Sequence, residues 1–327
     1  MNTQKRTAYY DILKGYAIFL VALGHVIQSF HPDWKENIII LATCSFHMPL
    51  FMIVSGKFFL HSLQKTSERA FIVNKVHRLL IPSVSWGLIN AIILGGGYFL
   101  KHSEIDLIYM INLTVVGMWF LTVLFILSVI GAVIEKRCSK YRYLLWIIVF
   151  VTLNILPAFW LRNELIYLLP FFVLAYSFSN LDWSRINHSI GIISVILFCL
   201  MLHFYSFDDS LYQMDDQVMT GAYHFKAIFR FCIGAVGSLA SIWICRFLQE
   251  IPHLRNVLIY LGGITLPIYV LHQKFMMWNY SIMYTNSSML FDLCVTILII
   301  LLSLAFYKIM VKSTLLKRYF FGEYNKS

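Results

Sequence analysis

Long apolar runs alternate with short polar connections along this chain of 327 residues. Each run is almost free of charged side chains and is about 20 residues long, the length that an α-helix needs to cross ~30 Å of hydrocarbon. Charged and turn residues mark the boundaries. The pattern predicts ten membrane spans, at 9–30, 38–60, 79–100, 107–134, 143–161, 165–178, 187–206, 224–246, 256–278 and 289–311. The sequence therefore predicts an all-α, polytopic membrane protein.

The composition agrees with this pattern and removes other classes of protein. Hydrophobic residues make up 59% of the chain and charged residues 13%, whereas about 25% of an ordinary soluble domain is charged. A soluble globular protein and a disordered chain are both excluded. The six cysteines are scattered, mostly within apolar runs, so we interpret them as packing residues and expect no metal site. Because no polar connection is long enough to form a second core, residues 1–327 are predicted to be a single transmembrane domain.

The net charge of +10 follows the sides of the predicted membrane. Most of the 26 Lys and Arg residues lie at the two termini and in the connections after the second, fourth, sixth and eighth spans. The opposite connection, between the seventh and eighth spans, carries four acidic residues, Asp208, Asp209, Asp215 and Asp216. The positive-inside rule then predicts that both termini are cytoplasmic. The basic charge is explained as a topology signal, so no nucleic acid is expected as a partner.

The first predicted span carries three ionisable side chains, Asp11, Lys14 and His25. Such residues are costly within a bilayer and usually mark a functional site or a mutually satisfied pair. At ~100° per residue, eleven residues return to within ~20° of the same azimuth, so Lys14 and His25 share one helix face, ~16 Å apart along the axis. Asp11 lies one turn below Lys14. The alternative to a functional stripe is a structural ion pair together with a packed histidine.

Further ionisable residues are predicted at the depth of His25. Counting ~1.5 Å per residue from the predicted span ends places His47, Arg230 and His272 in the outer half of the membrane. A buried, neutral imidazole can act as a general base when a neighbouring group bonds its second nitrogen. For His47 and Arg230, a hydrogen bond within the core is the alternative interpretation.

A basic connection at 61–78 follows the second span. It mixes Lys75, His77 and Arg78 with apolar side chains, a composition typical of an amphipathic segment at the membrane interface. These basic side chains could hold phosphate groups. The alternative is a linker whose basic side chains bind lipid headgroups.

Five segments resemble, in the same order, motifs of the membrane acyltransferase-3 family. They are the segment 11–25, which begins with DILKG and ends with GH, and then SFHMPLFMIVSG (45–56), KVHRLLIP (75–82), MWFLTVLF (118–125) and LPIYVLHQ (266–273). The block around His47 is most similar to the branch that includes fucose 4-O-acetylase-like proteins. The interfacial motif departs from the family's usual pair of arginines, because Lys75 replaces the first while Arg78 remains. A lysine can still hold phosphate as a point charge, but the bidentate geometry is lost.

The resemblance implies a multi-pass O-acyltransferase of the bacterial inner (cytoplasmic) membrane. Members of the family move an acyl group, usually acetyl from acetyl-CoA, to a sugar hydroxyl of a cell-surface or exported glycan or its lipid-linked precursor. His25 is then the general base of a direct transfer, with Lys14 at the inner end of the acyl path and Asp11 fixing Lys14. Three basic residues would hold the CoA phosphates: Lys75, His77 and Arg78. Five residues are expected to bind the substrates: His47, Trp119, Arg230, Tyr269 and His272.

Several alternatives stay open at this point. Trp119, His47, Tyr269 and His272 are all candidates for stabilising the oxyanion, and Trp119 and Tyr269 are equally ordinary as packing aromatics. A transporter or flippase for a glycan or lipid-linked precursor also uses buried Lys, Arg and His. Against it, the chain shows no inverted repeat. A membrane scaffold without chemistry would leave the polar stripe of the first span unexplained.

Overall fold

The chain is all-helical wherever the structure describes it. The computed structural model describes residues 3–102, 107–157, 161–207, 221–276 and 288–324, and these residues contain helices and connections without a strand. Within the described residues, six helical segments are long and apolar enough to cross a membrane. There are seven if a bent pair of helices counts as one span. The all-α prediction is confirmed for these residues. The number of ten spans and the cytoplasmic position of the termini stay predictions.

The helices form two compact units, Met1–Lys57 with Leu174–Phe306, and Phe58–Val173 with Tyr307–Ser327. The first unit holds α1 (Thr3–Phe30), η1 (Trp34–Glu36), most of α2 (Ile38–Gln64), η4 (Trp183–Arg185), α9 (His188–His203), α10 (Gly221–Leu248), α11 (Pro252–Gly263), α12 (Thr265–Met276) and most of α13 (Met289–Met310). The second holds α3 (Glu68–Lys75), η2 (Val76–Leu80), α4 (Ile81–His102), α5 (Leu107–Val116), α6 (Trp119–Arg137), η3 (Ser139–Tyr141), α7 (Arg142–Ile155), most of α8 (Arg162–Ser177) and α14 (Thr314–Phe321).

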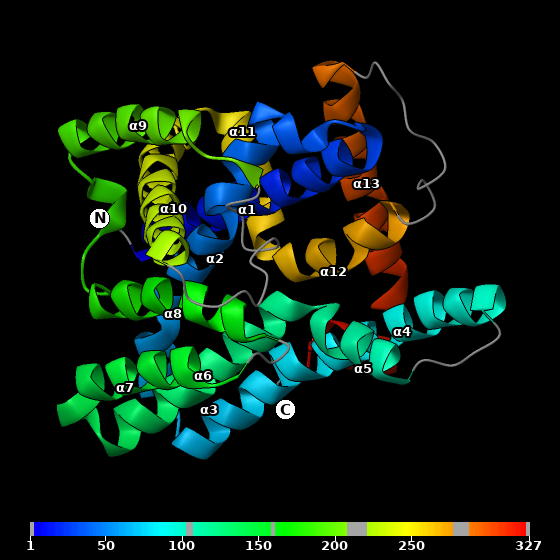
Figure 1. Cartoon of the computed structure of the whole chain (residues 1–327), viewed down its shortest axis with the longest axis horizontal. Helices are drawn as coiled ribbons and strands as arrows, with labels where there is room; N and C mark the ends of the chain where they lie inside the picture. Colours follow the sequence, from blue (N-terminus) through cyan, green and yellow to red (C-terminus); the bar gives the residue numbers. More distant parts are fainter. Residues whose placement is uncertain (1–2, 103–106, 158–160, 208–220, 277–287, 325–327) are drawn as a thin grey trace. The chain divides into compact units, whose positions relative to one another are not determined.

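Helix α1 organises the first unit by packing against α10, α11 and α12 (Figure 1). Two glycines bring α1 and α11 into backbone contact. A Cβ on Gly15 would lie 2.0 Å from the carbonyl oxygen of Leu258, and one on Gly262 would lie 1.9 Å from that of Asp11. Only glycine fits such an approach. The next turns of α1 bury apolar side chains against α11, α12 and α13, in a cluster of Ile18, Val21, Ala22, Leu261, Ile268 and Ile300.

The segment predicted as one span at 256–278 is two helices in the structure. Helices α11 and α12 meet at an angle of 85°, which Figure 1 shows as a corner in the yellow and orange ribbon. Gly262 and Gly263 end α11, where their low helix propensity weakens the turn. Pro267 lies in the first turn of α12, where its missing N–H interrupts no intrahelical hydrogen bond. The sequence thus favours the end of one helix and the start of another, which mean hydropathy does not show.

The second unit also differs from the predicted boundaries. The segment expected to be an interfacial connection is helical from Glu68 and continues through the π-helix η2 into α4 as one apolar stretch, Glu68–Gly96. Ser67 caps its start by accepting a hydrogen bond from the Ala70 N–H at 3.2 Å. Phe71 is buried against Phe59, with ring centroids 5.8 Å apart, and this packing holds α3 to the unit. The predicted span at 107–134 is likewise divided, into α5 and α6.

The end of the chain returns to the π-helix. The indole N–H of Trp86 donates to the carbonyl oxygen of Phe320 at 2.8 Å, which fixes the end of α14 to α4. Gly322 follows with φ 61°, the left-handed conformation that ends many helices. A Cβ at Gly322 would lie 2.6 Å from the carbonyl oxygen of His77. The last described residues therefore lie directly against the basic motif at 75–78.

Candidate functional site

The polar stripe predicted on the first span lies on one unbroken helix. Lys14 Nζ and Asp11 Oδ1 form an ion pair at 2.6 Å, and both side chains are about a third exposed. Because α1 continues without a break to Phe30, the eleven residues from Lys14 to His25 keep the two on one face, ~16 Å apart. The structural ion pair and the continuous stripe are therefore both present.

Two glutamine side chains hold the His25 imidazole. Nδ1 of His25 lies 3.1 Å from Oε1 of Gln28, one turn further along α1. Nε2 lies 3.2 Å from Nε2 of Gln273, on α12. An amide oxygen only accepts and an amide NH2 only donates, so this arrangement fits the tautomer with the proton on Nδ1 and a lone pair on Nε2. The ring is thus presented in the form that a general base requires.

A second histidine lies beside His25. The ring centroids of His25 and His272 are 5.2 Å apart, and Tyr269 lies 6.3 Å from His272. His272 is 1% exposed, and its Nδ1–H donates to the carbonyl oxygen of Ile268 at 2.8 Å. Its Nε2 therefore carries a lone pair, and within the described residues that atom has no hydrogen-bond partner. A donor such as a substrate hydroxyl would satisfy it.

His47 uses the same arrangement on α2. Its Nδ1–H donates to the carbonyl oxygen of Thr43 at 2.5 Å, and the ring is buried. In this tautomer Nε2 of His47 accepts hydrogen bonds, as in His272. Neutral imidazoles held in this way suit the binding of hydroxyl groups better than the stabilisation of an oxyanion, which needs a donor.

The remaining predicted residues divide between the two units. Arg230 is buried on α10 in the first unit. Trp119 begins α6 in the second unit and packs edge to face against Phe120, with ring centroids 6.0 Å apart. The basic residues Lys75, His77 and Arg78 also belong to the second unit. The structure thus brings together His25, His272 and Tyr269, and separately the three basic residues.

The basic motif has partners that no sequence pattern indicated. The Lys75 ammonium lies 5.1 Å from the ring centroid of Phe71. The His77 ring stacks on Tyr324 at 4.2 Å with an interplanar angle of 21°, and the Arg318 guanidinium lies 4.7 Å from the same tyrosine ring. Arg78 is exposed. Cationic and aromatic groups at this end of the unit form a surface that favours phosphate and a planar ring.

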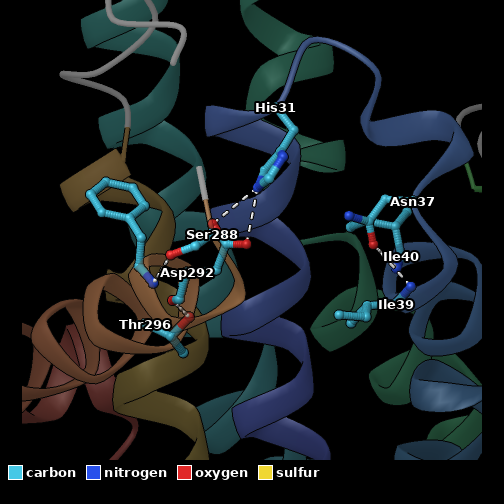
Figure 2. A network of polar contacts seen from close by, with 8 residues as sticks. His31, Asn37, Ile39, Ile40, Ser288, Asp292 and Thr296 are labelled. Carbon is cyan, nitrogen blue, oxygen red and sulfur yellow. Dashed lines mark hydrogen bonds and ion pairs between the residues drawn. The ribbon is translucent and has the colours of Figure 1, made fainter. Parts of the chain in front are cut away.

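The C-terminal end of α1 is tied to α13 by a buried carboxylate (Figure 2). His31 Nε2 lies 3.0 Å from both Oδ1 and Oδ2 of Asp292, which is 2% exposed. Thr296 donates to the carbonyl oxygen of Asp292 at 2.7 Å, and Ser288 accepts from the Phe291 N–H at the start of α13. Because His31 directly follows the last residue of α1 and Asp292 lies on α13, this contact fixes the end of α1 that carries His25.

We predict that His31→Ala destabilises the protein by about 3 kcal/mol, because it removes a partner of a buried carboxylate. Thermal unfolding in detergent measures the loss. The double variant with Asp292→Asn should recover part of it, since the uncompensated charge is then gone. A melting temperature for His31→Ala equal to that of the unsubstituted protein would contradict the role assigned to this pair.

Among the described residues, no three or more His, Cys, Asp or Glu side chains are arranged to hold a metal ion. The neighbouring imidazoles of His25 and His272 instead meet glutamine and backbone groups. Sequence reasoning missed Gln28 and Gln273 as partners of His25. Gln273 ends the motif LPIYVLHQ, so attention to the polar residue after His272 would have found it.

Comparisons with known proteins match most of the chain. The family described as "Acyltransferase domain" matches residues 7–308. Nodulation protein NolL from Sinorhizobium fredii (strain NBRC 101917 / NGR234) is 28% identical over 209 residues, which are 60% of this chain and 55% of that protein. Nodulation protein NolL from Mesorhizobium japonicum (strain LMG 29417 / CECT 9101 / MAFF 303099) is 25% identical over 199 residues, 56% of this chain and 51% of that protein. The chain thus matches about half the length of these curated relatives. No solved structure matches significantly.

Proposed function

Since this chain belongs to the acyltransferase-3 family, we propose that it is a membrane O-acyltransferase that moves an acetyl group from acetyl-CoA to a sugar hydroxyl. The acceptor is a cell-surface or exported glycan, or its lipid-linked precursor. The observation that carries the proposal is the His25 imidazole, held with its lone pair on Nε2. We retain the whole chain, 1–327, as one acyltransferase domain in the bacterial inner membrane.

His25 acts as the general base. Its Nε2 takes the proton of the acceptor hydroxyl while the hydroxyl oxygen attacks the thioester carbonyl. The C–S bond then breaks, and His25 returns the proton to the CoA sulfur. Gln28 keeps the proton on Nδ1 through these steps, because its amide oxygen accepts from that nitrogen. No covalent intermediate on the protein is required.

The imidazoles beside the base bind the acceptor. His272 Nε2 offers a buried lone pair to a sugar hydroxyl next to the one that reacts. His47 offers a second lone pair, and Tyr269 and Arg230 are the donors of the same unit assigned to the substrates. Asp11 fixes Lys14 through their ion pair, which keeps the ammonium oriented on the face of α1 that carries His25. Trp119, in the second unit, stays a predicted substrate-binding residue.

The donor is held by Lys75, His77 and Arg78. Acyl-CoA carries several phosphates and an adenine ring. The motif offers two cationic residues, Lys75 and Arg78, and its His77 stacks on Tyr324, a ring that Arg318 also contacts. Charge-assisted hydrogen bonds from a guanidinium to phosphate are among the stronger polar contacts in proteins. Chemistry of this kind requires no metal ion.

The test is a transfer assay with the full chain in lipid nanodiscs. Acetyl-CoA with a labelled acetyl group is incubated with methyl glycosides such as methyl α-L-fucopyranoside, and ester formation is followed together with the release of free CoA thiol. One acetyl ester per thiol is expected. If no sugar gains an acetyl group while the same protein in sealed proteoliposomes carries a labelled glycan precursor across the bilayer, the protein is a transporter and the proposal is wrong.

We predict that Arg78→Ala weakens CoA binding about tenfold or more, because a charged hydrogen bond contributes roughly 1.5–3 kcal/mol. Binding of CoA to the purified variant measures this directly. Arg69→Ala is the matched control, since Arg69 is an exposed arginine on the same continuous helix. Equal affinities in the Arg78 variant, the control and the unsubstituted protein would place the nucleotide site elsewhere.

A further inference from the structure

Each ring nitrogen of His25 has a hydrogen-bond partner in the structure, and the two partners lie on different helices. Gln28 is on α1 itself, three residues from His25, so it moves with the ring. Gln273 is 248 residues away and reaches His25 from α12. The nitrogen that Gln273 covers is Nε2, whose lone pair the base must use.

The amide nitrogen of Gln273 stands where an acceptor oxygen has to stand. It lies 3.2 Å from His25 Nε2, and a hydroxyl that gives its proton to a base must approach to about 2.6–3.2 Å. Two donors cannot share one lone pair at that distance. An acceptor hydroxyl therefore replaces the Gln273 amide, exchanging an N–H donor for an O–H donor.

The surroundings allow this exchange. His25, Gln28 and Gln273 are all half-buried, so none of them is sealed in the core. The residue before Gln273 is fixed, because His272 is buried and its Nδ1–H donates to the Ile268 carbonyl oxygen. The backbone of α12 thus stays in place while the flexible side chain of Gln273 turns away. The exchange loses and gains one hydrogen bond, so its net free energy is small.

We propose that Gln273 is a positioning residue that guards His25, covering the Nε2 lone pair until an acceptor hydroxyl displaces it. This inference rests on the proposed function. Its consequence is protection of the acyl donor from water. With an uncovered base, a water oxygen would attack the thioester carbonyl, the C–S bond would break, and His25 would pass the water proton to the sulfur. Acetyl-CoA would then be hydrolysed to acetate and CoA.

If Gln273 guards His25, removing its side chain should make the base more accessible to water and to the sugar. Gln273→Ala should raise the hydrolysis of acetyl-CoA in the absence of an acceptor about five- to tenfold, the factor that corresponds to one hydrogen bond. The KM for methyl α-L-fucopyranoside should fall by a similar factor, because the sugar no longer competes with the amide. A residue with a purely structural role would change these quantities in the opposite direction.

Gln28→Ala is the matched control, because it removes the same type of side chain from the other nitrogen. It frees the imidazole to place its proton on either nitrogen, so both hydrolysis and transfer should fall. The two glutamine variants are therefore expected to move hydrolysis in opposite directions from the unsubstituted protein.

A second readout does not depend on acetyl-CoA. Diethyl pyrocarbonate acylates unprotonated imidazole nitrogens, and the extent of modification at His25 can be read by peptide mass spectrometry. The rate at His25 should rise five- to tenfold in Gln273→Ala, with His253, an exposed histidine on α11, as the internal reference. Unchanged or lower modification and hydrolysis in Gln273→Ala would overturn the guard. Absence of transfer to any glycoside by the unsubstituted protein would instead overturn the proposed function, whatever the reagent shows.

Discussion

His25→Ala is expected to abolish acetyl transfer while leaving the fold and CoA binding intact. Loss of a general base lowers the rate by about 10²–10⁴-fold, and the Nε2 lone pairs of His272 and His47 are assigned above to sugar hydroxyls other than the one that reacts. The measurement is the rate of ester formation on methyl α-L-fucopyranoside in nanodiscs, together with the melting temperature and the affinity for CoA.

The matched control for this result is His253→Ala. His253 is an exposed histidine in the first turn of α11, so its loss should leave the transfer rate unchanged. If a well-folded His25→Ala variant transfers acetyl at the rate of the control, His25 is not the base. The transfer mechanism proposed above would then need another proton acceptor.

Gly262→Ala is expected to destabilise the protein by about 3 kcal/mol, near the upper end of the usual overpacking cost. The new Cβ would lie 1.9 Å from the carbonyl oxygen of Asp11, an atom of the α1 backbone. No rotamer relieves this contact, so α11 must move away from α1 and disturb the Asp11–Lys14 turn. Thermal unfolding and the transfer rate should both fall.

The adjacent glycine provides the control for that prediction. A Cβ on Gly263 meets no atom within 4 Å, so Gly263→Ala should leave the melting temperature almost unchanged. Both variants add one methyl group to the end of the same helix. Equal stability of the two variants would show that α1 and α11 do not approach as closely as the structure describes.

The sequence predicted correctly that α1 is helical, and therefore that Asp11, Lys14 and His25 share one of its faces. Ionisable residues separated by three and eleven positions share a face of any continuous α-helix, and α1 is continuous from Thr3 to Phe30. The family resemblance, carried by five short segments in order, is confirmed by the match over residues 7–308. Helical periodicity and residue identity are local properties, so the chain displays them without its tertiary structure.

Boundaries and partners were harder to predict. Hydropathy merged α11 and α12 into one span, because an apolar window cannot show an 85° bend at Gly262 and Gly263. Hydropathy also placed a boundary between the segment that begins at Glu68 and the helix that follows it. The charged residues of the segment lower its mean hydropathy, although Phe71 is buried against Phe59. Mean hydropathy contains neither the break that two glycines allow nor the packing of one aromatic side chain on another.

The sequence by itself determined an all-helical, apolar chain of the acyltransferase-3 family with Asp11, Lys14 and His25 on one helix face. Only the tertiary structure decided what surrounds that face. It brought Gln273 from 248 residues away to the Nε2 of His25 and placed the His272 ring beside it. It also stacked Tyr324 on His77. The physical reason is that a helical period fixes which side chains share a face, whereas the groups they meet depend on how distant helices pack. Here that packing depends on glycines that admit backbone contact and on the buried His31–Asp292 pair.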